Sequence, residues 1–271
     1  MVVRIEKDGP VWTVIHDRPE ARNAMDPESA DALTEAFLEF DADDKASVAV
    51  FYGAGGAFCA GWDLKFVSTL DSNYPLGELD IPPAKPRGNG SDIPRGPLGP
   101  SRLELDKPVI AAVAGPAVAG GMELALWCDF RVMQEDAYFG VYSRRWGVPL
   151  IDGGTVRLPR IVGLGRALEI ILTGRKVPSD ECLRIGLCEY VVPNGTVRGE
   201  AERIAREIAR FPQVCVRADR RSAIRSHGLS VRDALIQEWY NGREALTKDG
   251  VAGAARFKDG LGRHGDFGKI D

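Results

Sequence analysis

The amino-acid sequence predicts an α/β fold, and three features of the chain point to this class. Short runs rich in β-branched and aromatic residues come first, one clear amphipathic helix lies between them, and helical patterns dominate after about residue 155. The chain has 271 residues, of which 44% are hydrophobic and 27% are charged. These values are ordinary for a globular protein, so we expect one main domain with room for one appended segment.

Five β-rich runs predict the strands of the first half of the chain. The turn KDGP separates the first two runs, and the predicted helix separates the second from the third. The runs are VVRIE (2–6), VWTVIH (11–16), SVAVFYG (47–53), KPVIAAVAG (107–115) and FRVMQ (130–134).

The helix between the second and third runs has clear start signals. Asp26 is a good N-cap, and Pro27 suits the first helical position because its φ is already helical. Apolar residues then recur at helical spacing, at Leu33, Ala36, Phe37 and Phe40. A β-α alternation therefore opens the chain.

Residues 66–104 break this alternation, because they are crowded with proline and glycine and cannot carry a regular element. We expect a long surface loop there and interpret it as a lid that orders on a ligand. After residue 155 four helical patterns follow, with the β-like piece CEYVVP among them. They are RALEIILTG, PSDECLRIG, EAERIAREIARF and VRDALIQEWYNGREALT.

Composition argues against several classes of protein. The formal net charge is only −4 and the basic residues are scattered, so we expect no nucleic-acid partner. Charges interrupt the amino end every few residues, and no apolar run approaches the roughly 20 residues that span a bilayer, so we expect neither a signal peptide nor membrane attachment. The five cysteines form no CxxC pair, which indicates free thiols and a cytoplasmic location.

Common cofactor and metal motifs are missing. GLGRAL (163–168) has only the first two glycines of a dinucleotide loop, and a helix start is the better interpretation. His16, His227 and His264 have no partner at ligand spacing, so we expect each to be exposed or hydrogen-bonded and expect no metal site. Catalysis would then depend on carboxylates and on the backbone.

Two glycine-rich junctions suggest the backbone part of such a site. Predicted strands run into AGW in the segment 50–65 and, through a turn that contains proline, into AGG in the segment 109–124. Small residues let a ligand approach the main chain, and a helix start leaves N–H groups without intrahelical partners. The two junctions either hold an oxyanion together or only make tight turns.

Five sequence blocks, in order, resemble the enoyl-CoA hydratase/isomerase family, the crotonase superfamily. They are RPEARNAMD, GAFCAGWDL, KPVIAAVAGPAVAGGMELALWCD, GGTVRLPRIVG and ALEIILTGRKVPSDECLRIGLCEYVV, and the likeness covers roughly residues 1–260. The resemblance implies a crotonase-like ββα spiral core over 1–200, which includes the 66–104 loop. It also implies a helical region over 201–271 that forms a homotrimer, often paired into a hexamer, and covers the active site.

The resemblance also implies the ligand and the residues that hold it. The ligand is an acyl-CoA thioester, with no metal or redox cofactor. Its thioester oxygen is held by the backbone N–H groups that match Trp62 and Gly120. The rest of the substrate lies along Arg22, Ala24, Asp63, Leu64, Lys65 and Ser143.

Glu123 matches the catalytic acid/base of the family. If Gly120 is the N-cap, Glu123 is the third helical residue, and its carboxylate projects toward the helix end where the Gly120 N–H points. The alternative is a charge that stabilises the helix terminus, or half of a capping box.

The chain departs from the hydratase pattern at Ser143, where hydratases of this superfamily carry a second glutamate. A hydroxyl cannot replace a carboxylic acid as a proton donor near neutral pH. Asp152 stands immediately before GGT, where the family's dienoyl-CoA isomerases have an aspartate, so Asp152 is the second catalytic candidate. The alternative for Asp152 is an N-cap for a helix that begins near Gly153.

These observations predict an enoyl-CoA hydratase, a lyase of fatty acid metabolism that adds water to a 2-enoyl-CoA through a thioester enolate. Two alternatives stay open. The first is an enoyl-CoA or dienoyl-CoA double-bond isomerase, and the second is an acyl-CoA-binding protein with little catalysis.

Overall fold

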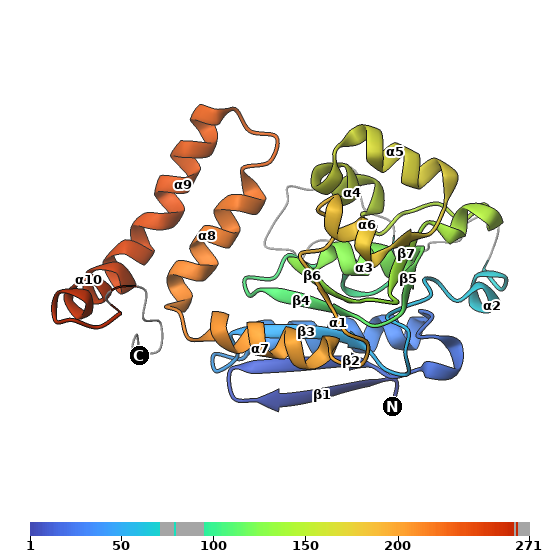
Figure 1. Cartoon of the computed structure of the whole chain (residues 1–271), viewed down its shortest axis with the longest axis horizontal. Coiled ribbons are helices and arrows are strands. Elements are labelled where there is room, and N and C mark those ends of the chain that lie inside the picture. Colours follow the sequence, from blue (N-terminus) through green and yellow to red (C-terminus); the bar gives the residue numbers. More distant parts are fainter. Residues whose placement is uncertain (71–78, 80–94, 263, 265–271) are drawn as a thin grey trace.

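The computed structural model describes residues 1–70, 79, 95–262 and 264. The strands in these residues form two sheets (Figure 1). The larger sheet has the order β1-β2-β3-β4-β6-β9, in which β1 and β2 are antiparallel and the other neighbours are parallel. Its strands are β1 (Val3–Asp8), β2 (Val11–His16), β3 (Val48–Gly53), β4 (Val109–Val113), β6 (Phe130–Gln134) and β9 (Tyr190–Val192). The α/β class and all five predicted strands are confirmed.

The smaller sheet has the order β5-β7-β8 and was not visible in the sequence. Its strands are β5 (Pro116–Val118), β7 (Tyr138–Gly140) and β8 (Val177–Pro178). The strand β5 corrects one prediction, because Pro116 opens a short strand where we expected only a turn. Proline is acceptable as the first residue of a strand.

Helices follow the strands and dominate the carboxyl-terminal half, as predicted. The α-helices are α1 (Pro27–Ala42), α2 (Leu64–Val67), α3 (Gly120–Trp127), α4 (Gly154–Val162), α5 (Leu164–Thr173), α6 (Ser179–Arg184), α7 (Val197–Ala209), α8 (Gln213–Arg225), α9 (Val231–Ala245) and α10 (Val251–Lys258). Short 3-10 turns are η1 (Pro19–Ala21), η3 (Pro100–Arg102) and η4 (Tyr142–Trp146), and a π-helical turn, η5 (Leu246–Gly250), joins α9 to α10. The start of α1 is confirmed, since Asp26 accepts a 2.9 Å hydrogen bond from the Ser29 N–H.

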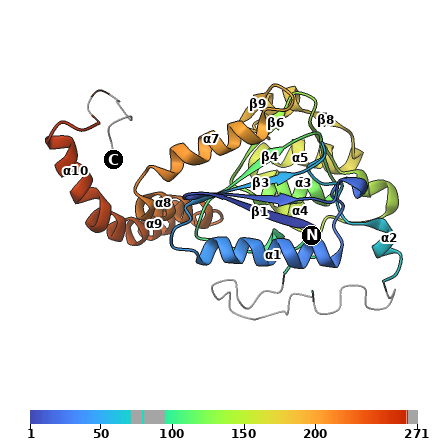
Figure 2. The same cartoon turned by 90° about the horizontal axis from the view of Figure 1, so that it is seen from below.

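Alternate residues of the larger sheet point to opposite faces, and each face has its own hydrophobic cluster. Trp12 and Phe51 face the cluster that contains α1 and α3, whereas Val11 and Val50 face the cluster of α7. Figure 2 shows α1 and α7 on opposite sides of the strands. The helix α3 thus belongs to the hydrophobic cluster that also contains α1 and one face of the larger sheet.

The helix α7 crosses residue 200, where we expected the core to end. It packs on β2, β3, β4 and β6, so it covers the sheet. The helices α8, α9 and α10 project away from the strands, as Figure 1 shows. The part of the chain that stands apart from the spiral therefore begins after Ala209.

The ends of the proline- and glycine-rich segment 66–104 are more regular than predicted. The helix α2 runs into it, and the 3-10 turn η3 lies close to its end. Residues 71–78 and 80–94 lie outside the described residues, so the lid stays a prediction.

Free thiols are confirmed in the structure. Four cysteines are buried and Cys215 is exposed, and none forms a disulfide. In the described residues, no helix is long and apolar enough to cross a membrane.

The prediction for His16 is wrong. This side chain is fully buried at the end of β2, and neither ring nitrogen has a hydrogen-bond partner among the described residues. Burial lowers its pKa to about 4, so the ring is neutral near pH 7. The predictions for His227 and His264 are confirmed, because both are exposed.

Candidate active site

One cavity of about 90 Å³ brings together four parts of the chain that are distant in sequence. They are the end of the junction after β3, Leu98, the start of α3, and the segment 142–152. The predicted residues Trp62, Gly120, Glu123, Ser143 and Asp152 all line this cavity.

The smaller sheet explains why two of these parts meet. The strands β5 and β7 are parallel, with Val118 opposite Gly140, and the Ala119 N–H donates a 2.7 Å hydrogen bond to the Gly140 carbonyl. Because parallel strands end at the same edge, the chain that leaves β5 toward Gly120 and the chain that leaves β7 toward Ser143 emerge side by side.

The junction after β3 packs closely against the start of α3. The Val118 N–H donates to the Cys59 carbonyl at 3.0 Å. A Cβ atom on Gly61, which has φ +87°, would lie 3.0 Å from the Gly120 nitrogen, so only glycine fits. The N–H groups of Trp62 and Gly120 have no hydrogen-bond partner among the described residues. Two residues that line the cavity therefore have free backbone donors.

The start of α3 differs by one residue from the prediction. Ala119, not Gly120, is the N-cap, so Glu123 is the fourth helical residue. Ala119 has φ 54° and ψ −122°, a conformation that disfavours any side chain and typically costs about 1–3 kcal/mol. Such strain is common at functional sites, and here it stands immediately before Gly120, which lines the cavity.

Glu123 makes no capping hydrogen bond to its own helix, so the capping-box alternative is wrong, although its side chain does lie in the first turn of α3. Its Oε1 atom accepts hydrogen bonds from the Asp152 N–H (3.0 Å) and the Gly154 N–H (2.8 Å). The side chain is almost fully buried yet lines the cavity. These two bonds fix the carboxyl group and leave Oε2 without a partner among the described residues.

The electrostatics of Glu123 suit proton transfer near neutral pH. Burial, followed by the nearby Asp152 carboxylate, raises the pKa of Glu123 to about 8, and the two backbone N–H groups oppose this rise. A general acid or base works best when its pKa lies near the working pH.

Asp152 does not cap the following helix, so this alternative is also wrong. The N-cap of α4 is Gly153, and Asp152 Oδ1 instead accepts hydrogen bonds from the Leu98 N–H (3.1 Å) and from the Ser101 hydroxyl. Burial raises the pKa of Asp152, and the Ser101 hydrogen bond opposes the rise. Asp152 thus connects the cavity to the segment around Leu98.

Ser143 presents an unsatisfied hydroxyl to the cavity. Its Oγ atom is buried and has no hydrogen-bond partner among the described residues. A buried polar group without a partner costs about 1–3 kcal/mol. Water or a polar group of a ligand is the natural partner for this hydroxyl.

The remaining residues expected to bind substrate lie mostly outside the cavity. Leu64 lines it, whereas Arg22, Ala24, Asp63 and Lys65 do not. They lie on the adjoining surface, where the Ala60 N–H donates to the Arg22 carbonyl at 3.0 Å.

Sequence reasoning missed several residues that organise the site. Arg18 connects two of the predicted segments, because it bonds to the Ala24 carbonyl (2.8 Å) and pairs with Asp63 (2.9 Å). Leu98 and Ser101 lie in the proline- and glycine-rich segment, whose composition predicts turns but does not indicate which residue enters a site.

The described residues contain no group of three or more His, Cys, Asp or Glu that could hold a metal ion. The site offers two kinds of chemical group on this chain: backbone donors that can hold an anionic oxygen, and a buried carboxyl group that can move a proton.

The fold and a cavity that holds a buried carboxyl group next to two residues with free backbone N–H groups can now be set beside known proteins. The chain belongs to the enoyl-CoA hydratase/isomerase family, whose profile matches residues 6–74 and 101–242. The crotonase-like spiral is thereby confirmed.

Two similar proteins illustrate the relationship. Carnitinyl-CoA dehydratase from Salmonella arizonae is 33% identical over 243 residues, which cover 88% of this chain and 84% of that protein. Enoyl-CoA hydratase EchA19 from Mycobacterium tuberculosis is 35% identical over 225 residues, which cover 80% of this chain and 78% of the relative.

Solved structures agree with the fold. The enoyl-CoA hydratase EchA1 from Mycobacterium marinum has a TM-score of 0.83 at 30% identity, with 95% of this chain and 96% of that chain covered. An enoyl-CoA hydratase from Bacillus anthracis has a TM-score of 0.83 at 27% identity, with 96% of each chain covered.

Proposed function

We propose that this protein is an enoyl-CoA hydratase, a lyase that adds water across the 2,3 double bond of an enoyl-CoA. The observation that carries the proposal is the placement of Glu123, a buried carboxyl group with raised pKa, in one cavity with the N–H groups of Trp62 and Gly120. The names of the related hydratases and dehydratases support the same reaction.

The two backbone donors stabilise the enolate. The thioester oxygen accepts hydrogen bonds from Trp62 and Gly120, and each donor of this kind is typically worth about 3–4 kcal/mol once negative charge develops. Because the donors are main-chain groups held by a tight contact at Gly61, they need no rearrangement during the reaction.

Glu123 moves the proton in this proposal. The ionised carboxylate takes a proton from water as the water oxygen forms a bond to C3, and the electron pair of the double bond moves onto the thioester oxygen. The proton then passes from Glu123 to C2, which restores the carboxylate. One water molecule is consumed, and no further cofactor takes part.

A double-bond isomerase is the second candidate, and Asp152 favours it. This second carboxyl group with raised pKa lines the same cavity, and an isomerase needs only to take a proton from one carbon and return it to another. The third candidate, an acyl-CoA-binding protein with little catalysis, is favoured by Ser143 in place of a second acid.

The adenine and phosphate end of coenzyme A has a natural path in this proposal. It follows the segment 62–65 and passes the segment 22–24, where Arg22 and Lys65 supply positive charge. Both segments are joined to the cavity wall through Arg18 and Ala60.

Self-association as a homotrimer or hexamer belongs to the same proposal. The helix α9 exposes a row of large apolar side chains, which is typical of an interface. They are Val231, Leu235, Ile236, Trp239 and Tyr240. We also place the protein in the cytoplasm, because its buried free thiols suit a reducing compartment.

Product analysis tests the function. The purified protein is incubated with a 2-enoyl-CoA in water labelled with heavy oxygen, and the products are identified by mass spectrometry. Label at C3 of a 3-hydroxyacyl-CoA supports the hydratase. A shifted double bond without label would favour the isomerase, and tight binding without turnover would favour the binding protein.

A further inference from the structure

Leu98 lies at the tip of a tight turn that enters the cavity. Gly96 and Gly99 exchange two backbone hydrogen bonds of 2.9 Å each, which closes the turn around Pro97 and Leu98. Gly99 has φ +74°, and a Cβ atom there would collide with the backbone of Ala30 in α1. The turn is therefore seated on α1 and cannot easily shift.

Buried polar groups hold the same turn from the other side. The Leu98 N–H and the Ser101 hydroxyl both donate to Asp152 Oδ1. Arg157 donates to the Asp152 carbonyl (2.9 Å) and to the Ser101 carbonyl (2.8 Å). Arg95 adds an ion pair with Asp31 of α1. Leu98 is thus fixed in position by contacts with both α1 and the segment before α4.

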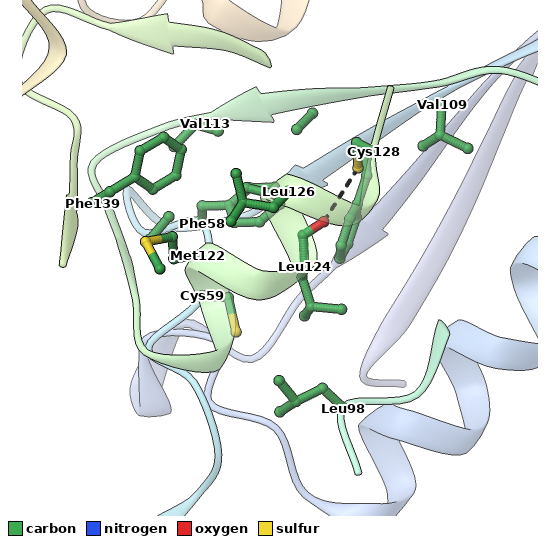
Figure 3. Close-up of a cluster of buried hydrophobic side chains, with 14 of the residues drawn as sticks. Phe58, Cys59, Leu98, Val109, Val113, Met122, Leu124, Leu126, Cys128 and Phe139 are labelled. Carbon is green, nitrogen blue, oxygen red and sulfur yellow. Dashed lines mark hydrogen bonds between the residues drawn. The ribbon is translucent and has the colours of Figure 1, made fainter. Parts of the chain in front are cut away.

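The Leu98 side chain occupies the space beside the first residue of α3. It is 2% exposed, lines the cavity, and would overlap a methyl group added at Gly120. Figure 3 shows Leu98 pointing toward α3. It therefore lies next to the N–H group that is proposed to hold the thioester oxygen, where the acyl chain begins.

The cavity is small for a site of this kind. Its volume of about 90 Å³ compares with roughly 300–1,000 Å³ for typical ligand pockets. Only the acyl end of the substrate fits inside, and apolar residues such as Val148 and Ile151 complete its wall.

We infer that Leu98, held in place by Asp152 and Ser101, sets the acyl-chain length and restricts the enzyme to short 2-enoyl-CoA substrates of about four carbons. This inference rests on the proposed function. In it, Leu98 is a specificity-determining residue and Asp152 is a positioning residue that acts through the Leu98 N–H.

The first test replaces Leu98 with alanine and compares kcat/KM for eight-carbon and four-carbon 2-enoyl-CoA. One methylene in an apolar pocket changes the preference between two substrates about tenfold or more. The ratio of kcat/KM for the eight-carbon to the four-carbon substrate is therefore expected to rise at least about tenfold. The matched control is Leu105→Ala, because Leu105 is buried near this segment but does not line the cavity. Its ratio is expected to equal that of the wild type.

Leu98→Val provides a milder variant in case the alanine variant does not fold. It removes one methylene and is expected to raise the ratio in the same direction by a smaller factor. An unchanged ratio in every folded Leu98 variant, or a wild-type preference for the eight-carbon substrate, would overturn the inference while leaving the hydratase function intact. Wild-type protein that hydrates no 2-enoyl-CoA of any length would overturn the function and the inference with it.

Asp152 is tested by the chain-length ratio and not by activity alone. In Asp152→Asn the amide oxygen still accepts from the Leu98 N–H and the Ser101 hydroxyl, so the ratio is expected to stay at the wild-type value. Asp152→Ala removes both bonds and Ser101→Ala removes the one from the hydroxyl, and each variant is expected to raise the ratio severalfold. If Asp152→Asn and Asp152→Ala both lower turnover equally for all chain lengths, Asp152 acts in the chemistry and its positioning role is refuted.

Discussion

The cavity around Glu123 and the helices α8–α10 differ in whether their side chains find partners within the described chain. Around the cavity, buried polar groups such as Glu123 and Asp152 are bonded to backbone N–H groups of other segments. On α9, large apolar side chains such as Trp239 and Leu235 are more than half exposed. The carboxyl groups of the first region find their partners within the chain, whereas the second exposes an apolar face that we propose as the self-association surface.

This difference predicts how the two regions respond to substitution. Changes at the cavity should remove chemistry and leave assembly intact, and changes on α9 should do the reverse. The following experiments challenge that separation, in order of decreasing effect.

Glu123→Gln is expected to have the largest effect. The amide cannot accept or return a proton, so hydration should fall about 10²- to 10⁴-fold. The substitution has nearly the same shape and keeps an oxygen that accepts from Asp152 and Gly154, so the oligomer and the melting temperature should change little. Steady-state hydration kinetics, sedimentation and a thermal melting curve check these three statements. Substantial residual hydration would assign the proton transfer to another group.

The Gly120 N–H is expected to have the next largest effect. Proline is tolerated at the first helical position and removes only the donor, but its ring would overlap Leu98. The comparison is therefore made in the Leu98→Ala background, between Gly120→Pro and Gly120→Ala. Loss of one oxyanion donor should lower kcat about 10²- to 10³-fold in the proline variant relative to the alanine variant. Equal rates would remove Gly120 from the oxyanion site.

Trp239→Asp on α9 is expected to change assembly and to affect chemistry less. A charge on this apolar face should dissociate the oligomer, as measured by multi-angle light scattering. Leu38→Asp is the matched control, because Leu38 is an exposed apolar residue on a different helix, α1. If both variants keep the wild-type mass, α9 is not the self-association surface.

Ser143→Ala is expected to have the smallest effect. The hydroxyl contributes one hydrogen bond to water or product, worth about 0.5–1.5 kcal/mol, so hydration should fall by about two- to tenfold. Ser143→Glu is the complementary variant, since it restores the acid of related hydratases. A hydration rate above that of the wild type would show that the lack of a second acid limits hydration by the native enzyme.

Much of the fold could be predicted because its signals are local. Strand alternation and the cap at Asp26 mark β1–β4, β6 and α1 without reference to the rest of the chain. The strands of the smaller sheet could not be predicted, since β5, β7 and β8 have only two or three residues and show no periodicity.

The candidate site was predictable where it follows motifs and unpredictable where it depends on tertiary contact. Glu123 and Gly120 follow from a motif, although the helix start was misplaced by one residue. Ala119 has a positive φ where the chain packs closely against Gly61, and no local pattern encodes such a contact. Leu98 likewise depends on long-range contacts, among them a bond to Asp152, 54 residues later in the sequence.

The pH dependence of hydration tests whether Glu123 is the acid/base with a raised pKa. Ionised Glu123 is the form that accepts the proton from water, and its pKa is about 8. Therefore kcat/KM should rise about tenfold per pH unit below pH 8 and level off above it. Dehydration of the 3-hydroxyacyl-CoA should follow the same curve, because the overall reaction takes up no proton. If kcat/KM of the wild-type protein stays constant from about pH 6 to 9, Glu123 is not an acid/base with a raised pKa.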